Sequence, residues 1–144
     1  MSPKIKKKIL ALIYRTRNDT QEFLVLKKSA DPVHGPAVFY VVTGAVEKDE
    51  SNLSAAKREI EEETGITNII NVTKLDKIYE YKHPAEEDYL CQEYCFAVLI
   101  DDEVRHLSEE HTEYKWLSRD DFVDTIDWYY DKEDLKQLIK SIDK

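Results

Sequence analysis

"GAVEKDESNLSAAKREIEEETGI", residues 44–66, decides the fold, because it carries the signals of a helix together with an unusual concentration of charge. Capping side chains precede the apolar residues, and Gly65 is suited to follow a helix C-terminus, so the sequence predicts a helix over 52–64. Four glutamates crowd the C-terminal half of that helix: Glu59, Glu61, Glu62 and Glu63. Their position needs an explanation, because negative charge at a helix C-terminus opposes the helix dipole.

The helical repeat of 100° per residue sorts these residues onto faces. Leu53, Ala56 and Ile60 form an apolar stripe, which we expect to pack against a sheet. A neighbouring stripe carries three carboxylates at i, i+3 and i+4: Glu59, Glu62 and Glu63. Ala55 lies on that stripe one turn earlier, and its small side chain would leave room for a ligand to approach. Glu61 points in another direction.

The clustered carboxylates destabilise the isolated helix. Like charges at i, i+4 repel by a few tenths of a kcal/mol per pair, and each anion near the C-terminus costs about 0.3–1 kcal/mol. A divalent cation would reverse the sign of both effects. Oxygen ligands without Cys or His among them favour Mg²⁺ or Mn²⁺ over Zn²⁺. The alternative is a solvated, glutamate-rich surface, which composition alone would favour.

Length and composition describe one globular domain over 1–144, large enough to bury a core without disulfides. The apolar stretch Ile9–Tyr14, after a lysine-rich start, is too short for a secretory signal and predicts a strand. No apolar run in the sequence is long enough to span a membrane. Cys91 and Cys95 favour buried free thiols over a zinc site, which suits a reducing, cytoplasmic location.

Apolar runs separated by polar turns predict the remaining elements. Strands are expected at 9–14, 22–28, 37–42, 69–82 (one long or two short), 89–100 and 112–117. Ser118, with Asp121 three residues later, predicts a helix start, and an amphipathic stripe predicts a helix over 131–142. Strands mixed with a few helices predict an α/β or α+β sandwich.

Residues 44–66 resemble the signature of the Nudix hydrolases, G-x5-E-x7-R-E-U-x-E-E-x-G-U, in which U is aliphatic. All nine specified positions are filled without a gap: Gly44, Glu50, Arg58, Glu59, Ile60, Glu62, Glu63, Gly65 and Ile66. Seven of the nine require one particular residue, so a chance match is improbable even in a chain rich in glutamate. The resemblance implies the α/β/α sandwich of that family, built around a mixed β-sheet.

The resemblance also implies an activity: hydrolysis of a nucleoside diphosphate linked to another group, by water attack on phosphorus. Mg²⁺ (or Mn²⁺) would assist, with more than one ion once substrate is bound. By position, the metal ligands would be Glu59, Glu62 and Glu63. Glu50 would stand behind these ligands and Arg58 would orient them, while Gly44 would permit a tight loop and a close approach to metal or phosphate.

Members of the family usually add a carboxylate from outside this motif. The segment "LSEEHTEYKWL", 107–117, offers Glu109 and Glu110, and Glu110 beside His111 best matches the pattern of several small Nudix enzymes. Glu110 is therefore the expected fourth metal ligand, against the alternative of a solvated acidic loop. The resemblance leaves the general base open among Glu59, Glu62 and Glu110.

The substrate is less defined. The approach "FYVVTGAVE", with its threonine-glycine step, resembles the dihydroneopterin triphosphate and (d)NTP pyrophosphohydrolases, whereas 107–117 is also similar to diadenosine tetraphosphate hydrolases. We favour a nucleoside or pterin triphosphate cleaved to monophosphate and pyrophosphate. Lys27 and Lys28 are candidates to contact phosphate, and Phe39 and Tyr40 to contact the ring; solvated strand ends and core packing are the alternatives.

Composition and the complete motif also bear on other classes of function. The net charge of −9 and the lack of a basic stripe argue against binding long nucleic acid, and so against an RNA 5′-end pyrophosphohydrolase. An inactive Nudix-fold binding module usually lacks a carboxylate of the motif, and this chain lacks none. An acidic domain that only sequesters divalent ions would bind metal without turnover. The sequence leaves the oligomeric state open.

Overall fold

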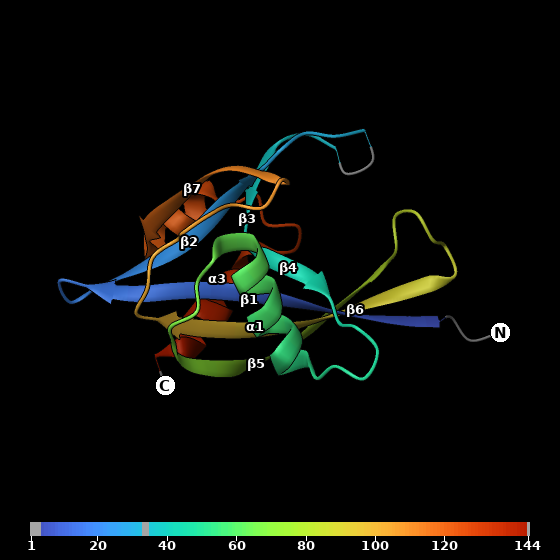
Figure 1. Ribbon diagram of the computed structural model, residues 1–144, viewed down its shortest axis with the longest axis horizontal. Coiled ribbons are helices and arrows are strands. Elements are labelled where there is room, and N and C mark those ends of the chain that lie inside the picture. Colours follow the sequence, from blue (N-terminus) through green and yellow to red (C-terminus); the bar gives the residue numbers. More distant parts are fainter. Residues whose placement is uncertain (1–3, 33–34, 144) are drawn as a thin grey trace.

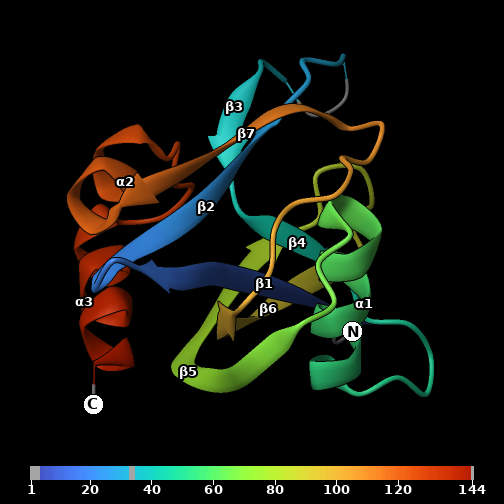
Figure 2. The same ribbon diagram turned by 60° about the vertical axis from the view of Figure 1, so that its left-hand side comes forward.

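The computed structural model describes residues 4–32 and 35–143 and shows a mixed sheet covered by helices on both faces (Figures 1 and 2). The strands are β1 (Lys4–Arg17), β2 (Thr20–Lys28), β3 (Val38–Tyr40), β4 (Val42–Ala45), β5 (Ile69–Lys82), β6 (Tyr89–Ile100) and β7 (His111–Ser118). The helices are α1 (Asn52–Thr64), α2 (Arg119–Thr125) and α3 (Lys132–Ile142). The predicted sandwich class is confirmed.

Strand β1 organises the sheet. The order β3-β2-β1-β6-β5 places it at the centre, with β4 also pairing to β1 and β7 to β2. The β1–β6 pair is parallel, and the other strand pairs are antiparallel. Because side chains alternate across a strand, β1 supplies both faces of the core. Ile9, Ala11 and Ile13 pack on the α1 side, whereas Leu10 and Leu12 pack on the side of α2 and α3.

Local sequence signals explain where α1 begins and ends. The Ser51 Oγ accepts a hydrogen bond from the Ser54 N–H at 3.1 Å, which caps the N-terminus. Gly65 ends the helix in the left-handed conformation at φ 75°, and its N–H donates to the Glu61 carbonyl at 2.8 Å. The predicted range 52–64 is confirmed.

Two expectations about the faces of α1 are wrong. Leu53 is 42% exposed, although it points almost in the same direction as the buried Ile60. A helical wheel gives the direction of a side chain, but not whether another element lies opposite it. Ala55 is 0% exposed and enclosed in the apolar cluster on the α1 side, so no ligand can approach along it.

The predicted strand over 37–42 is two strands. β3 pairs with β2, whereas β4 pairs with β1 and continues through Gly44 to Ala45. The chain therefore changes partner strand at Val41, which a run of apolar residues cannot reveal. β1 is longer than the predicted 9–14, since it runs to Arg17 and turns at Asn18 and Asp19, both with positive φ.

The other expectations for the fold agree with the structure. β5 is one long strand, with irregular pairing between Lys74 and Ile78. Cys91 and Cys95 are buried free thiols. Within residues 4–32 and 35–143, no helix is both long and apolar enough to cross a membrane.

Substitutions at Ile60 and Leu53 test which part of the apolar stripe of α1 is covered by the rest of the fold. Ile60→Ala should lower the free energy of unfolding by about 2–5 kcal/mol, because it opens a cavity beneath the helix. Leu53→Ala should change it by roughly 0.5 kcal/mol or less, because that side chain is exposed. Urea unfolding measures both. Equal losses would contradict the exposure of Leu53 in the structure.

Candidate active site

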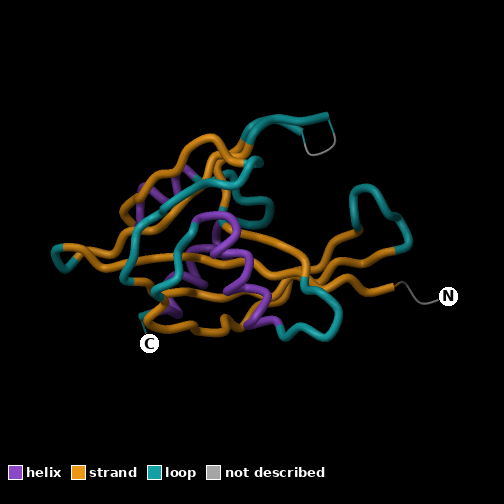
Figure 3. Tube along the Cα trace, in the orientation of Figure 1, coloured by secondary structure: helices purple, strands orange, loops and turns teal. Residues whose placement is uncertain are grey.

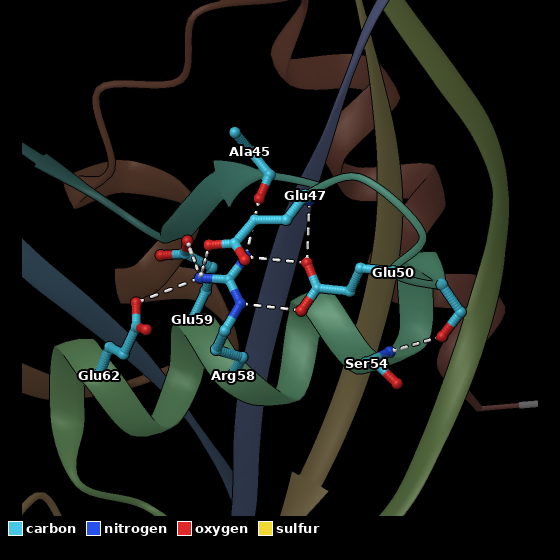
Figure 4. Close-up of polar contacts among 8 residues, drawn as sticks. Ala45, Glu47, Glu50, Ser54, Arg58, Glu59 and Glu62 are labelled. Carbon is cyan, nitrogen blue, oxygen red and sulfur yellow. Dashed lines mark hydrogen bonds and ion pairs between the residues drawn. The ribbon is translucent and has the colours of Figure 1, made fainter.

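Arg58 connects the loop after β4 to the acidic face of α1 (Figure 4). Its guanidinium donates to both carboxylate oxygens of Glu50, at 2.8 and 3.0 Å, and to the Ala45 carbonyl at 2.9 Å. It also donates to Glu59 Oε1 at 2.8 Å and to Glu62 Oε2 at 3.2 Å. This planar donor group fixes the positions of two helix carboxylates relative to β4.

Glu50 completes this connection. Its Oε1 accepts a hydrogen bond from the Glu47 N–H at 3.0 Å, which holds the loop closed. The bonds from Arg58, and then the Glu47 N–H, lower the pKa of Glu50 to about 2. Glu50 is therefore ionised at neutral pH and serves as the fixed anchor of the guanidinium.

Carboxylates from two segments of the chain line one cavity of about 540 Å³. Its acidic residues are Glu59, Glu62, Glu63, Glu109 and Glu110, and its other lining residues are Lys8, Lys28, Thr43, Gly44 and Ser108. The structure thus brings together the four carboxylates expected as metal ligands. Glu61 is exposed and does not line this cavity, as expected.

Glu63 is the buried member of this group, at 8% exposure. Its Oε2 has no hydrogen-bond partner among the described residues, and its Oε1 lies 3.7 Å from His111 Nε2. Burial, and then the negative charges of Glu59, Glu110 and Glu62, raise the pKa of Glu63 to about 9. The site therefore holds a carboxyl group that is costly to ionise unless a positive charge comes close.

Gly44 allows Glu59 to approach the sheet. The expectation of a tight loop there is wrong, because Gly44 lies within β4 opposite Ile9. A Cβ at this position would come within 2.5 Å of the Glu59 Cγ and even closer to its carboxyl carbon. Gly44 thus leaves the space that the Glu59 side chain occupies, and a larger residue would displace that side chain.

The loop between β6 and β7 is held against the C-terminal end of α1 (Figure 3). The Arg105 N–H donates to the Thr64 carbonyl at 2.8 Å, and His106 Nε2 lies 3.0 Å from the Glu62 carbonyl. These contacts carry the loop to Glu110 and place it over the acidic helix. No sequence pattern identifies His106 as part of the site, since its partner is a backbone carbonyl 44 residues away.

A second cavity, of about 480 Å³, adjoins the first, and we call it the aromatic cavity because four tyrosines contribute to its lining. The two share Lys8, Lys28, Thr43, Glu63 and Glu110. The second adds, among others, Tyr40, Tyr81, Glu93, His111, Tyr129 and Tyr130. The acidic and aromatic cavities together form one continuous site.

The structure divides the four residues expected to contact substrate. Lys28 and Tyr40 line the aromatic cavity. Lys27 instead lies over the Phe39 ring, with Nζ 5.7 Å from the ring centroid, and neither residue lines either cavity. Sequence patterns did not identify Lys8 or Glu93 as site residues, because the neighbouring residues in each strand do not indicate which side chains line a cavity.

The side chains of the glutamates in the acidic cavity are not arranged as a complete set of metal ligands in this structure. Within the part of the chain that the structure describes, no three His, Cys, Asp or Glu side chains are arranged to hold an ion. Each hydrogen bond from Arg58 to Glu59 and Glu62 uses one oxygen of a carboxylate that has two.

A match over most of the chain shows its family. A family model described as NUDIX domain matches residues 6–138. The chain belongs to this family. It is therefore a Nudix hydrolase, and the enzymes of this family act on pyrophosphate bonds and generally use divalent metals.

Relatives named for different activities are similar to this chain. The chain is 28% identical over 116 residues to an RNA pyrophosphohydrolase of Pelagibacter ubique, covering 69% of this chain and 72% of the relative. An Ap4A hydrolase of C. elegans has 25% identity and a TM-score of 0.68, covering 96% and 95% of the two chains. The dihydroneopterin triphosphate pyrophosphohydrolase of E. coli has 23% identity and a TM-score of 0.67, covering 93% and 95%.

Gly44→Ala tests the contact between β4 and Glu59. The new methyl group should displace the Glu59 carboxyl and lower kcat for diphosphate hydrolysis by about tenfold or more, while the melting temperature changes little. Ala45→Ser, at the neighbouring exposed position, is the control and should retain activity. Unchanged kcat in Gly44→Ala would contradict a role for the position of Glu59.

Proposed function

We propose that the protein is a Mg²⁺-dependent pyrophosphohydrolase that cleaves a nucleoside or pterin triphosphate to the monophosphate and pyrophosphate. The observation that carries this proposal is the acidic cavity, which carboxylates from α1 and from the β6–β7 loop line together with two lysines. Neither set of charges alone explains the arrangement. A polyphosphate chain with divalent cations would neutralise both.

The residues present fit magnesium. The acidic residues supply only oxygen atoms, which Mg²⁺ and Mn²⁺ prefer. The Oε2 of Glu63 is buried without a partner among the described residues, as a ligand atom would be before its ion binds. We assign Glu59, Glu62, Glu63 and Glu110 as the ligands.

The roles of the chain's own residues follow from their contacts. Arg58 and Glu50 hold Glu59 and Glu62 in position, and the loop contacts at the end of α1 position Glu110. Lys8 and Lys28, which line the same cavity, bind phosphate oxygens. The bound metal would polarise the phosphoryl group and lower the pKa of the attacking water.

The continuity of the two cavities supports a nucleotide-like substrate. A triphosphate would extend along the acidic cavity, and its flat ring would lie among the tyrosines of the aromatic cavity. Lys8 and Lys28 stand where the two cavities meet, so they would contact the phosphates nearest the sugar or linker.

Glu62→Gln is the direct test of the proposed ligands. It should lower kcat by roughly 100-fold or more, because it removes a charged ligand, whereas the exposed Glu61→Gln should be nearly silent. The assay follows phosphate release from nucleotides and pterin triphosphate with Mg²⁺ and added pyrophosphatase. Cleavage of diadenosine tetraphosphate, the remaining member of the panel, yields two mononucleotides and no pyrophosphate, so its products are separated by chromatography.

Equal effects of the two substitutions would contradict the assigned helix face. No turnover on any member of the panel, with either Mg²⁺ or Mn²⁺, would contradict the proposed activity itself.

A triphosphorylated RNA 5′ end is a second candidate substrate. Sequence reasoning missed a short row of basic and aromatic side chains, in which Lys4 and Lys6 lie 5.6 and 5.4 Å from the Tyr89 ring centroid and Lys8 lies 6.0 Å from that of Tyr81. The row leads away from the aromatic cavity, which Lys8 and Tyr81 line. The similarity to an RNA pyrophosphohydrolase supports the same candidate.

The two substrates are distinguished by the double substitution Lys4→Gln, Lys6→Gln. For an RNA enzyme it should raise KM for a triphosphorylated oligonucleotide and leave KM for GTP unchanged. Equal KM values for wild type and variant on the oligonucleotide would eliminate this candidate.

A further inference from the structure

A buried carboxyl group forms part of the wall of the aromatic cavity. Glu93, on β6, is 4% exposed and lines the cavity, although the acidic cavity does not include it. Its Oε1 accepts a hydrogen bond from the Tyr130 hydroxyl at 3.1 Å. Acidic side chains are seldom buried unless they are paired. Further hydrogen-bond donors would therefore stabilise the Glu93 carboxylate at this position.

The surroundings of Glu93 suit a flat ring. Tyr40 and Tyr129 stack with ring centroids 4.0 Å apart, and Tyr130 stacks on Tyr79 at 3.7 Å. Tyr81 also lines the cavity. The stacking restricts the movement of the tyrosine side chains. A ligand ring bound among them would therefore present one edge to the Glu93 carboxylate in a defined orientation.

The Glu93 carboxylate can accept more hydrogen bonds than the one it receives from Tyr130. Burial raises its pKa, whereas the hydrogen bond from Tyr130 and the charge of Lys8 act in the opposite direction. An ionised carboxylate has about four acceptor sites on its two oxygens, and the Tyr130 hydroxyl occupies one. Two N–H donors on the ligand would stabilise the ionised form.

We propose that Glu93 determines which ring the enzyme accepts, by binding two adjacent N–H groups on one edge of it. A ring amide N–H beside an exocyclic amino group provides this pattern, and guanine and pterin share it. Adenine presents one donor and one acceptor along its corresponding edge, so its ring nitrogen would face a carboxylate oxygen unfavourably. This inference rests on the proposed function and specifies its substrate class.

Kinetics on matched substrates tests the proposal. Wild type should prefer GTP over ATP by about 10- to 100-fold in kcat/KM, and ITP, which lacks the amino group, should fall between them. Glu93→Gln replaces one acceptor by a donor, so it should reduce the GTP preference by about the same factor, mainly through KM. Dihydroneopterin triphosphate, assayed in parallel, distinguishes a pterin from a guanine substrate.

Glu80→Gln is the matched control, because Glu80 lies exposed on the strand paired with β6 and accepts a hydrogen bond from Gln92 at 3.0 Å. It should leave the GTP preference unchanged. A GTP preference retained in Glu93→Gln, or equal use of ATP and GTP by wild type, would overturn the assignment.

Equilibrium binding gives a readout that is independent of turnover and of metal. Calorimetric titration of wild type with GMP and AMP should show tighter binding of GMP, and the difference should shrink in Glu93→Gln. This test stands even if the variant is unstable, because wild type alone must discriminate between the two. Discrimination without any turnover would overturn the proposed function and leave this inference intact; turnover without discrimination would do the reverse.

Discussion

Electrostatic repulsion among the carboxylates at the end of α1 is the constraint on which the rest of the site depends. Glu59, Glu62 and Glu63 occupy adjacent positions on the helix, and Glu110 is brought to the same cavity from another loop. Burial of Glu63 adds to the constraint, since together with the neighbouring carboxylates it raises the pKa of Glu63 and makes the group costly to ionise. One cation, Arg58, contacts two of these carboxylates, and it is shared with Glu50. The remaining negative charge is a binding site for positive charge.

Contacts on each side of α1 hold the mutually repelling carboxylates in place. Strand β4 provides the Ala45 carbonyl for Arg58 and, at Gly44, the space for the Glu59 side chain. The β6–β7 loop covers the C-terminal end of α1 with Arg105 and His106 and reduces the exposure of its carbonyl groups. The apolar stripe of Ala56 and Ile60 fixes the helix on the sheet. Stability elsewhere thus offsets the unfavourable charges at the site.

Sequence patterns predicted the helix, the carboxylate face and the sandwich because these depend on local periodicity. The capping residues and the spacing of the glutamates lie within one segment, so the wheel places Glu61 correctly outside the cavity. The predictions for Leu53 and Ala55 were wrong because the burial of a helix residue depends on what lies opposite the helix. Gly44 was assigned to a loop because strand pairing with Ile9 cannot be read from either segment alone. Glu93 and Lys8 could not be predicted as site residues for a similar reason, since the pairing of β1 with β6 brings them to one cavity and neither strand alone shows this pairing.

The dependence of stability on magnesium in wild type and in Glu63→Gln tests the central claim most directly. Without metal, the variant should melt at about the wild-type temperature or above it, because glutamine matches the uncharged carboxyl group. With Mg²⁺ at about 100 times its dissociation constant, wild type should gain roughly 2.7 kcal/mol, or about 5–10 °C in Tm, and the variant much less. A wild-type Tm that does not respond to Mg²⁺ or Mn²⁺, or an equal gain in both proteins, would contradict the account.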